Sequence, residues 1–282
     1  MKKINPKVNR IYAIGNLELL NKDSIAIIGS RNYSEYGKKI TIELTKDLVK
    51  NNIVIISGMA NGIDSIAHNA CIDNGGKTIA VLGSGFKNIY PKENEKLFYK
   101  ILDNGGLVIS EYPINVPVQK KNFPLRNRII SGLADAVLVI EATYRSGTSI
   151  TARYAKEQNK NVFCIPNSIG NKNSRGGIEL LKKGAILITN AYEIMKQMNF
   201  EVISKGNNRQ DFEKSIYKKL SNSQKEIFVQ LKKYDAMNIE ELKSKINLDI
   251  CEINQNITIM ELEDIIEDIG MGKYRLKKEF YE

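Results

Sequence analysis

The chain has 282 residues, is 42% hydrophobic and carries a formal charge of +10, which is enough sequence for one large domain and a small one. No apolar run approaches the ~18 residues of a membrane-spanning helix, and the N-terminal residues MKKINPKVNR lack the apolar core of a secretory signal. We therefore expect a cytoplasmic protein with no membrane partner. The three cysteines form no CxxC pair, which predicts free thiols, two of them buried, in a reducing compartment.

The positive charge is unevenly distributed along the chain. Residues 211–282 carry 12 basic and 15 acidic side chains, which leaves 30 basic and 17 acidic side chains on residues 1–210. A basic large domain joined to a slightly acidic small one predicts a polyanionic partner for the large domain only. A solvated, lysine-rich surface without such a partner explains the same numbers equally well.

From residue 24 onward, short β-branched runs alternate with helical stretches. Each run is apolar throughout rather than at every second residue, as expected for strands that are covered on both faces. The predicted strands are 24–30 (SIAIIGS), 52–58 (NIVIISG), 77–83 (KTIAVLG), 106–110 (GLVIS), 134–140 (ADAVLVI), 160–166 (KNVFCIP) and 184–189 (GAILIT). This alternation predicts an α/β fold with an open, doubly wound, mostly parallel sheet.

The pattern changes after Phe200. The segment SKGNNRQDFEKS is polar and indicates a linker. Three short amphipathic helices follow, the first with a capping box of Ser221 and Gln224, and IEDIGMGKYRLKK is typical of two short strands around a glycine-containing turn. We predict four parts: an N-terminal lead-in (1–22), an α/β domain (23–200), a linker (201–219) and a winged-helix-like domain (220–282).

The loops that follow the predicted strands are rich in Gly and Ser. They are GSRNYSEYG (29–37), SGMANGIDSIAH (57–68), GSGFKNIYP (83–91), SEYP (110–113), TYRSGTSITA (143–152) and PNSIGNKNSRGG (166–177). Parallel strands bring such loops to one edge of the sheet, where backbone N–H groups and helix N-termini bind anions. Several of them in a basic domain predict a ligand with more than one phosphate. Because G-x-x-x-x-G-K-[ST] and a correctly placed G-x-G-x-x-G are missing, ATP hydrolysis and dinucleotide chemistry are disfavoured.

Candidate catalytic groups are few. The single histidine, His68, lies four residues after Asp64 on a predicted helix, where the two could form an acid–base pair or, more commonly, a local hydrogen bond that orients the helix. The carboxylates at the ligand edge, Glu111 and Glu141, are far apart in the sequence. One histidine and no cysteine cluster provide neither a zinc site nor a catalytic triad. We therefore predict a binding protein with no enzyme activity, metal or cofactor.

The segment KKNFPLRNR, residues 120–128, combines cations with an aromatic ring. Pro124 suits a helix start, Phe123 offers a face on which a base can stack for ~1–3 kcal/mol, and the neighbouring cations can hold phosphates. In the alternative interpretation Phe123 packs as a hydrophobic staple and the arginines are helix-surface charges. These residues alone leave both interpretations open. Base-edge readout is not indicated, so single-stranded nucleic acid fits better than a duplex.

Blocks of sequence between residues 24 and 190 carry a family resemblance. They are AIIGSRNYSEYG, ISGMANGIDSIAH, TIAVLGSGFKNIYPKEN, GLVISEYP, FPLRNRIISGLADAVLVIEA, SGTSITARYA and FCIPNSI…GGIELLKKGA. In these blocks the sequence resembles the DprA family, also called Smf, of DNA-processing proteins of natural transformation. The resemblance implies an extended Rossmann domain that binds single-stranded DNA, forms a homodimer and helps to load a RecA-type recombinase onto incoming strands.

The resemblance also implies roles for individual residues. Arg31 would clamp a phosphate, while Lys120 and Phe123 would supply a cation and a stacking ring. Small residues in the loops would offer backbone or hydroxyl donors. The nucleic-acid-binding residues that we predict are Gly29, Ser30, Arg31, Ser57, Gly58, Lys120, Lys121, Phe123, Arg126, Asn127, Arg128, Ser146, Gly147 and Thr148.

Two other functions compete with DNA binding. The first is a nucleotide-binding sensor or an enzyme related to the cytokinin-activating phosphoribohydrolases. Those use a P-G-G-x-G-T-x-x-E loop, whereas this chain has YRSGTSITA without the glutamate, which argues against hydrolysis. The second is a regulatory role of the winged-helix tail, against which the cations Arg31, Lys120 and Arg126 argue. The third helix of the tail is acidic around residues 252–264, which suits a protein contact better than DNA.

Overall fold

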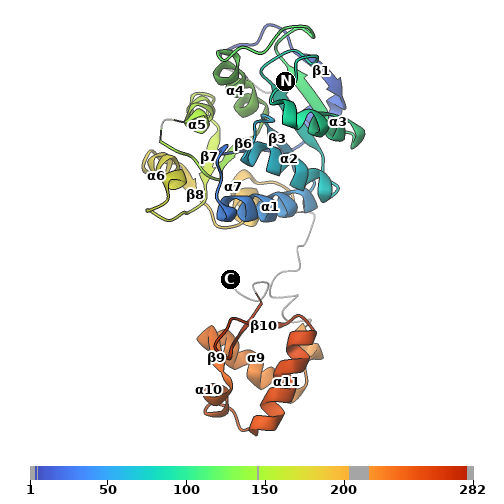
Figure 1. The fold of residues 1–282 in the computed structure, drawn as a ribbon. Coiled ribbons are helices and arrows are strands. Elements are labelled where there is room, and N and C mark those ends of the chain that lie inside the picture. Colours follow the sequence, from blue (N-terminus) through green and yellow to red (C-terminus); the bar gives the residue numbers. More distant parts are fainter. Residues whose placement is uncertain (1–3, 5, 145, 203–215, 278–282) are drawn as a thin grey trace. The chain divides into compact units, whose positions relative to one another are not determined.

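The computed structural model of the chain describes residues 4, 6–144, 146–202 and 216–277. The chain divides into two compact units, Met1–Ile203 and Ser204–Glu282, which we call unit 1 and unit 2 and describe separately (Figure 1). The predicted linker lies mainly outside the described residues. Among the residues described, no helix is both long and apolar enough to cross a membrane.

Unit 1 is built on an eight-stranded sheet with the order β1-β5-β4-β3-β2-β6-β7-β8. All seven predicted strands are present and parallel: β2 (Ser24–Ile28), β3 (Val54–Ser57), β4 (Thr78–Leu82), β5 (Leu107–Ser110), β6 (Ala136–Val139), β7 (Asn161–Cys164) and β8 (Ile186–Leu187). The remaining strand, β1 (Tyr12–Gly15), was not predicted and pairs antiparallel with β5. The predicted fold class, a mostly parallel doubly wound sheet, is therefore confirmed.

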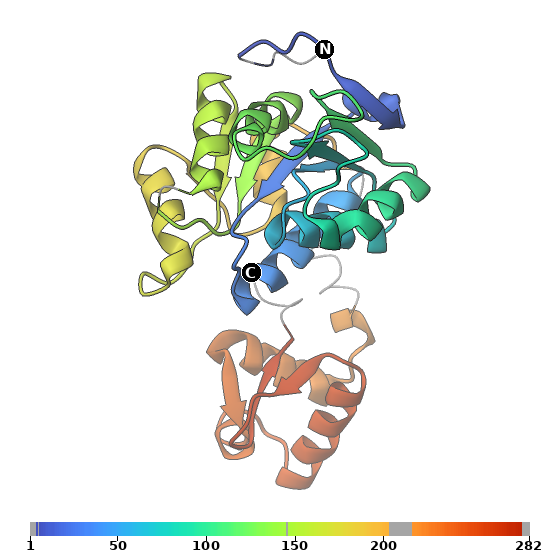
Figure 2. The same ribbon diagram turned by 45° about the horizontal axis from the view of Figure 1, so that its top comes forward.

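Helices cover both faces of this sheet, as Figures 1 and 2 show. On one face lie α1 (Glu35–Lys50), α2 (Ile63–Asp73), α3 (Glu95–Asp103) and α7 (Ala191–Met198), and on the other lie α4 (Asn122–Leu133), α5 (Gly147–Glu157) and α6 (Arg175–Lys182). Strand side chains alternate between the faces: Ile27 packs with α1 and α2, and Ile28 packs with α4 and α5. Burial of one such isoleucine stabilises the fold by about 1.5–3 kcal/mol. A continuous apolar run supplies buried side chains to the helices on both faces of the sheet.

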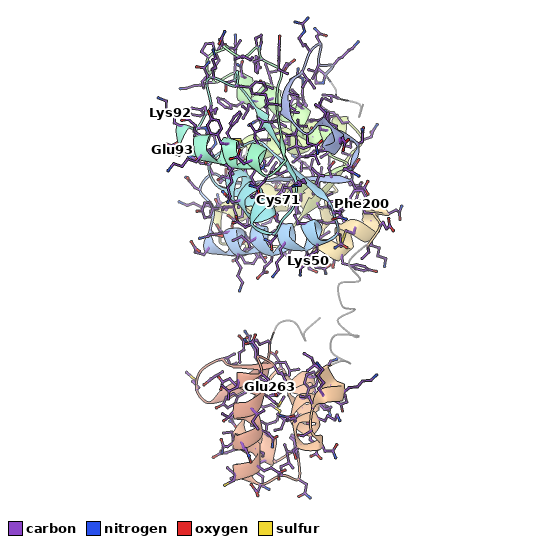
Figure 3. The ribbon with its side chains drawn as sticks, turned by 90° about the vertical axis from the view of Figure 1, so that its right-hand side faces the viewer. Lys50, Cys71, Lys92, Glu93, Phe200 and Glu263 are labelled. Carbon is purple, nitrogen blue, oxygen red and sulfur yellow. The ribbon has the colours of Figure 1, made fainter. Side chains whose placement is uncertain are left out.

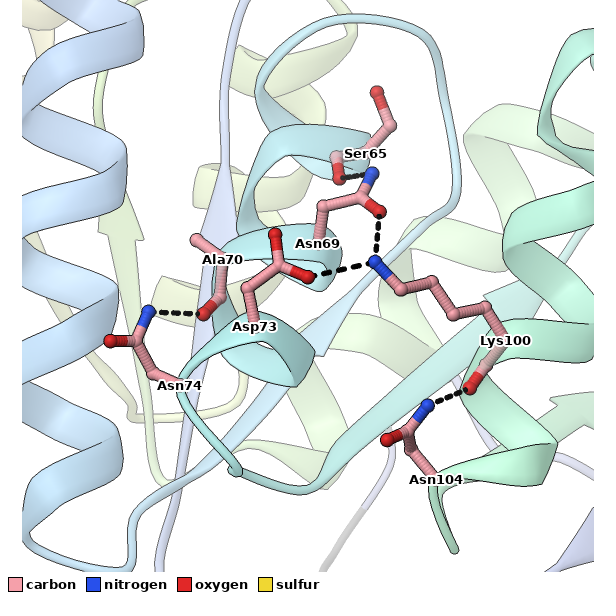
Figure 4. Close-up of polar contacts among 7 residues, drawn as sticks. All are labelled: Ser65, Asn69, Ala70, Asp73, Asn74, Lys100 and Asn104. Carbon is pink, nitrogen blue, oxygen red and sulfur yellow. Dashed lines mark hydrogen bonds and ion pairs between the residues drawn. The ribbon is translucent and has the colours of Figure 1, made fainter.

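A polar contact fastens α3 to α2 (Figure 4). The ammonium group of Lys100 donates to Asp73 Oδ1 at 2.8 Å and to Asn69 Oδ1 at 3.3 Å. Below this contact, Phe98 and Ile101 of α3 are buried in an apolar cluster with Ile72 of α2. Because the Lys100–Asp73 pair is exposed, the apolar cluster supplies most of the stability and the ion pair adds little.

Unit 2 is a small helical domain with an antiparallel sheet. Its elements are α9 (Asn222–Tyr234), β9 (Ala236–Asn238), α10 (Ile239–Lys243), α11 (Ile250–Leu262), β10 (Ile266–Asp268) and β11 (Lys273–Leu276), with the strand order β10-β11-β9. The predicted capping box is confirmed, since Ser221 Oγ accepts from the Gln224 N–H and the Gln224 side chain accepts from the Ser221 N–H. Three helices and a β-ribbon form the winged helix that the sequence predicts, and β9 is a third strand that it did not.

The cysteines are free thiols, as predicted. Cys71 lies in the interior of unit 1 (Figure 3), and Cys164 is buried at the end of β7. Burial raises the pKa of both thiols to about 12, because the thiolate is poorly solvated there. Cys251, on α11 of unit 2, is exposed.

Candidate functional site

The sheet of unit 1 has one topological switch point, between β2 and β6. These strands are paired, with Ile28 opposite Val139, but the chain proceeds from β2 toward β5 on one side and from β6 toward β8 on the other. The loops that leave their carboxyl ends therefore diverge, which is where open α/β sheets form ligand crevices. In this structure a groove of about 970 Å³ lies at that position, and its walls include the loops that follow β2, β4, β5, β6 and β7.

The groove contains most of the residues that the sequence predicts to bind nucleic acid. Its lining includes Gly29, Ser30, Arg31, Lys120, Phe123, Arg126, Asn127, Ser146, Gly147 and Thr148. Ser57, Gly58, Lys121 and Arg128 do not line it. It also contains residues that the sequence did not single out, namely Asn32, Tyr90, Val118, Lys172 and Asn173. Tyr90 and Lys172 lie in loops that were predicted to reach the ligand edge, but nothing in the sequence distinguished their side chains from their neighbours.

A buried carboxylate holds the polar side of the groove together. Glu141, at the end of β6, is 1% exposed and accepts from Ser34 N at 2.9 Å, Ser34 Oγ at 2.5 Å and Asn173 Nδ2 at 3.2 Å. These bonds fasten the loops after β2 and β7 to the sheet. Since the donors occupy both carboxylate oxygens, Glu141 positions the loops and is poorly placed to act as an acid or base.

The groove also presents groups that suit anions. Arg31 and Lys172 are exposed, and both line the groove. Helix α5 begins there, and its N-cap residue Ser146 makes no side-chain capping bond, so the first-turn N–H groups have no side-chain acceptor from the cap. The hydroxyl oxygen of Ser146 is buried without a hydrogen-bond partner. Two cations and an uncapped helix N-terminus together favour a negatively charged ligand.

Arg126 is an internal cation rather than a surface one. It is 4% exposed, and its Nη1 donates to the carbonyl of Gly58 at 2.6 Å and to that of Val81. Asp64, also buried, supplies a nearby negative charge and accepts from the N–H of Gly58 at 3.1 Å. Burial lowers the pKa of Arg126 to about 10, although Asp64 opposes that shift. Arg126 thereby fastens α4 to the ends of β3 and β4.

Arg128 and the β3 residues also have structural partners. Arg128 is 7% exposed, forms an ion pair with Glu111 at 2.6 Å and donates to the carbonyl of Leu125 at 2.7 Å. The Ser57 hydroxyl is buried and donates to the carbonyl of Ile27 at 2.7 Å. Gly58 is close-packed: a Cβ there would lie 2.7 Å from Arg126 Nη2. Arg126 lines the groove while its guanidinium donates to protein carbonyls, and Arg128 lies outside the lining in a buried ion pair, so neither is a helix-surface charge.

An aromatic pair also lines the groove. The rings of Phe123, in the first turn of α4, and Tyr90, in the loop after β4, have centroids 5.4 Å apart and planes at 51°. Tyr90 is 46% exposed, whereas Phe123 is half-buried against the backbone of Gly83. Lys120 and Val118, which precede α4, line the groove as well. The groove therefore presents both cations and aromatic rings, which come from loops on both sides of the switch point.

His68 does not contact Asp64, contrary to expectation. The ring is fully buried, and Nδ1 lies 2.7 Å from the hydroxyl of Thr78, which itself donates to the carbonyl of Ile55 at 2.7 Å. Thr78 therefore accepts from His68 Nδ1–H, which fixes the neutral tautomer. Burial lowers the pKa of His68 to about 3. Among the described residues, no cluster of His, Cys, Asp or Glu could hold a metal ion.

The chain is similar in sequence to a known protein family. Residues 1–199 match the model of the family described as DNA recombination-mediator protein A. The chain belongs to this family. Protein Smf of Escherichia coli is 43% identical over 190 residues, which are 67% of this chain and 51% of Smf, so the match spans about half of that relative. DNA processing protein DprA of Streptococcus pneumoniae is 44% identical over 67% of each chain.

Solved structures of family members have the same fold as unit 1. The X-ray structure of DprA from S. pneumoniae gives a TM-score of 0.63 at 43% identity, over 68% of this chain and 66% of that one. DNA processing protein A from Helicobacter pylori gives 0.65 at 33% identity, over 70% of this chain and 91% of that one. The H. pylori work is described as giving insight into a single-stranded DNA binding mode of that protein.

Proposed function

We propose that this member of the family binds single-stranded DNA in the groove of unit 1 and acts in DNA transformation and recombination as a binding protein, without catalysis. The observation that carries the proposal is that anion-binding groups and an aromatic pair line one groove. Arg31, Lys172 and the N-terminus of α5 match the phosphates of a strand, and the rings of Phe123 and Tyr90 match its bases. The single-stranded DNA binding mode described for the H. pylori relative supports this assignment.

Within the predicted set of binding residues, the contacts separate two roles. Arg31, Lys120 and Phe123 line the groove and are assigned to direct contact with the strand. Arg126 and Arg128 are buried in protein contacts and are assigned to positioning α4, which carries Phe123. The carbonyl of Gly58 accepts from Arg126 at the end of β3, and the Ser57 hydroxyl donates to the carbonyl of Ile27, so both are assigned to supporting the groove rather than to contact with the strand. This division explains how a run of cations in the sequence can serve the groove without every cation contacting DNA.

Partners and setting are also part of the proposal. We propose that the protein loads a RecA-type recombinase onto single strands, forms a homodimer through unit 1 and works in the cytoplasm. The family's description as a recombination mediator supports the first point. Helix α11 of unit 2 contains no Lys or Arg between Ile250 and Leu262, so we propose that unit 2 contacts protein rather than duplex DNA.

Binding of fluorescein-labelled oligo(dT) to the full chain, measured by anisotropy across a salt series, tests the proposal. The logarithm of the affinity should fall with the logarithm of salt by about 0.7 for each phosphate contact. Arg31→Ala should lower that slope, while Phe123→Ala should weaken binding with little change in slope. Arg153→Ala is the matched control, because Arg153 lies on α5, is exposed and does not line the groove. A salt-independent affinity would refute a DNA groove.

The second candidate function is a nucleotide-binding sensor or phosphoribohydrolase-like enzyme. The switch-point position of the groove favours it, because mononucleotides bind at the same place in related folds. Incubation with nucleoside monophosphates distinguishes the two functions. We expect no release of free base, since Glu141 is saturated by donors and Asp64 is buried beside Arg126. Steady release of base, or tight binding of a mononucleotide alone, would replace the DNA proposal with the enzyme or the sensor.

A further inference from the structure

Tyr90 is the more accessible of the two rings in the groove. Its side chain is 46% exposed, whereas the ring of Phe123 is covered on one side: a Cβ built on Gly83 would lie 3.0 Å from Phe123 Cδ1. The two rings are in contact, with centroids 5.4 Å apart. A strand that lies in the groove therefore meets Tyr90 at least as readily as it meets Phe123.

The loop that carries Tyr90 is held firmly in place. The N–H of Gly85 donates to the carbonyl of Val116 at 3.0 Å, and the N–H of Lys87 donates to that of Ile114 at 3.1 Å, so the loop pairs with residues 113–118. A Cβ at Gly85 would lie 2.2 Å from the carbonyl oxygen of Pro113, so this pairing requires glycine. Tyr90 therefore lies on a part of the groove wall that backbone hydrogen bonds hold in place.

The other end of the loop is also fastened. After Tyr90 the chain enters the 3₁₀ turn Lys92–Asn94, and the side chain of Asn94, buried, donates to the carbonyl of Met59 at 2.8 Å. Before Tyr90, the Ser84 hydroxyl donates to the carbonyl of Asn88 at 2.6 Å. The ring is therefore positioned before any ligand binds, which lowers the entropy cost of a contact with it.

The angle between the rings decides which strands can use both. Their planes are 51° apart, so a single base cannot stack flat on both rings. Successive bases that are stacked on each other are parallel and cannot lie on two tilted rings either. A strand must give up stacking between two of its bases to occupy both. This cost is small for thymine runs, which stack weakly, and larger for adenine runs, which stack well.

We propose, on the basis of the proposed DNA function, that Tyr90 is a second base-stacking residue and that the tilted Phe123–Tyr90 pair makes the groove prefer weakly self-stacked, thymine-rich single strands over adenine-rich ones. The preference arises from the angle between the rings of Phe123 and Tyr90 and needs no hydrogen bonds to base edges. Phosphate contacts from Arg31 and Lys172 are common to both kinds of strand and do not contribute to it.

The experiment measures affinities of the full chain for oligo(dT) and oligo(dA) of equal length, by anisotropy at fixed salt. The wild type should bind oligo(dT) more tightly. Tyr90→Ala should weaken oligo(dT) binding by about five- to tenfold, the lower end of the range for one lost stack, and oligo(dA) binding by less than about twofold. Tyr90→Phe should retain the preference. Tyr192→Ala, at another exposed tyrosine that lies on α7 outside the groove, is the matched control.

A direct readout is available because the chain contains no tryptophan. In Tyr90→Trp the introduced ring is the sole indole, and oligo(dT) should quench its fluorescence as a base stacks on it. Circular dichroism of each variant checks that the fold is retained, and if Tyr90→Ala is poorly folded the quenching of Tyr90→Trp still tests the inference, since an unquenched indole would overturn it.

The outcomes separate this inference from the proposed function. If Tyr90→Ala binds oligo(dT) as the wild type does while Arg31→Ala is weakened, Tyr90 is not a stacking residue and the DNA groove stands. Equal losses for oligo(dT) and oligo(dA) would also overturn the inference, because Tyr90 would then only support Phe123. If no oligonucleotide shows salt-dependent binding to any variant, the proposed function itself fails.

Discussion

Replacing Arg126 with methionine removes a buried cation and keeps most of the side-chain volume. In the native protein the guanidinium donates to the carbonyls of Gly58 and Val81 and lies near the buried carboxyl of Asp64. The variant leaves Asp64 buried without its counter-charge. Removal of one partner of a buried charge pair costs about 3–5 kcal/mol, so the free energy of unfolding of unit 1 should fall by roughly that amount at pH 7.

The loss should depend on pH through Asp64. Burial already raises the pKa of Asp64 above 3.8, and Arg126 opposes that rise, so the variant should raise the pKa further. A carboxyl whose pKa is higher in the folded than in the unfolded state favours folding when protonated, and that contribution is lost as pH rises through the folded pKa. The variant should therefore be most destabilised above the raised pKa, and its loss should shrink as the pH falls toward 3.8.

Urea unfolding followed by circular dichroism between pH 5 and pH 8 measures both effects. Phe228→Ala, which removes a buried ring from the core of unit 2, identifies the transition that belongs to that unit. The double variant Asp64→Asn/Arg126→Met has no buried charge at these positions and should lose the pH dependence. A loss below about 1 kcal/mol for Arg126→Met, or a loss of the same size at every pH, would refute the assignment of Arg126 and Asp64 as an internal charge pair.

Three further outcomes are expected. Gly85→Ala should separate the two loops that pair in the groove wall and lower the free energy of unfolding by about 1–3 kcal/mol, as measured in urea titrations. It should also weaken oligo(dT) binding without changing the salt slope. Unaltered binding would show that this pairing is not needed by the groove. Folding lowers the pKa of His68 from 6.5 to about 3, so the free energy of unfolding should decrease by roughly 1.4 kcal/mol per pH unit as the pH falls within that window. In acid titrations the free energy of unfolding of His68→Gln should decrease less steeply. Maleimide at pH 8 should label Cys251 in the folded chain and reach Cys71 and Cys164 only after denaturation, as mass spectrometry can verify.

The strands of unit 1 were predictable because their signal is local. A strand covered on both faces has a nearly continuous apolar run, and β2 to β7 have one, as in Ile25–Ile28. β1 could not be found in the same way. Its four residues lie at the edge of the sheet and three of them are exposed, and the short apolar run at residues 11–14 precedes the alternation of strands and helices that begins at residue 24.

The side-chain partners in the site were not predictable, because they come from distant segments. Arg126 and Arg128 stand two residues apart in the sequence, yet one donates to carbonyls at the ends of β3 and β4 and the other pairs with Glu111. Every residue has a backbone carbonyl, so the sequence does not show which carbonyls accept from an arginine. A buried arginine therefore cannot be told from an exposed one by sequence. Likewise, Thr78 rather than the nearby Asp64 is the partner of His68, since β4 lies behind α2.

The switch point also has a consequence for synthesis of the chain. β2 and β6 pair in the register Ile25 to Ala136, and the groove between their loops is completed by Lys172 and Asn173. Such a long separation along the sequence means that the central pairing forms late and slowly. A nascent chain on the ribosome therefore has no complete groove until β6 and the loop after β7 have emerged.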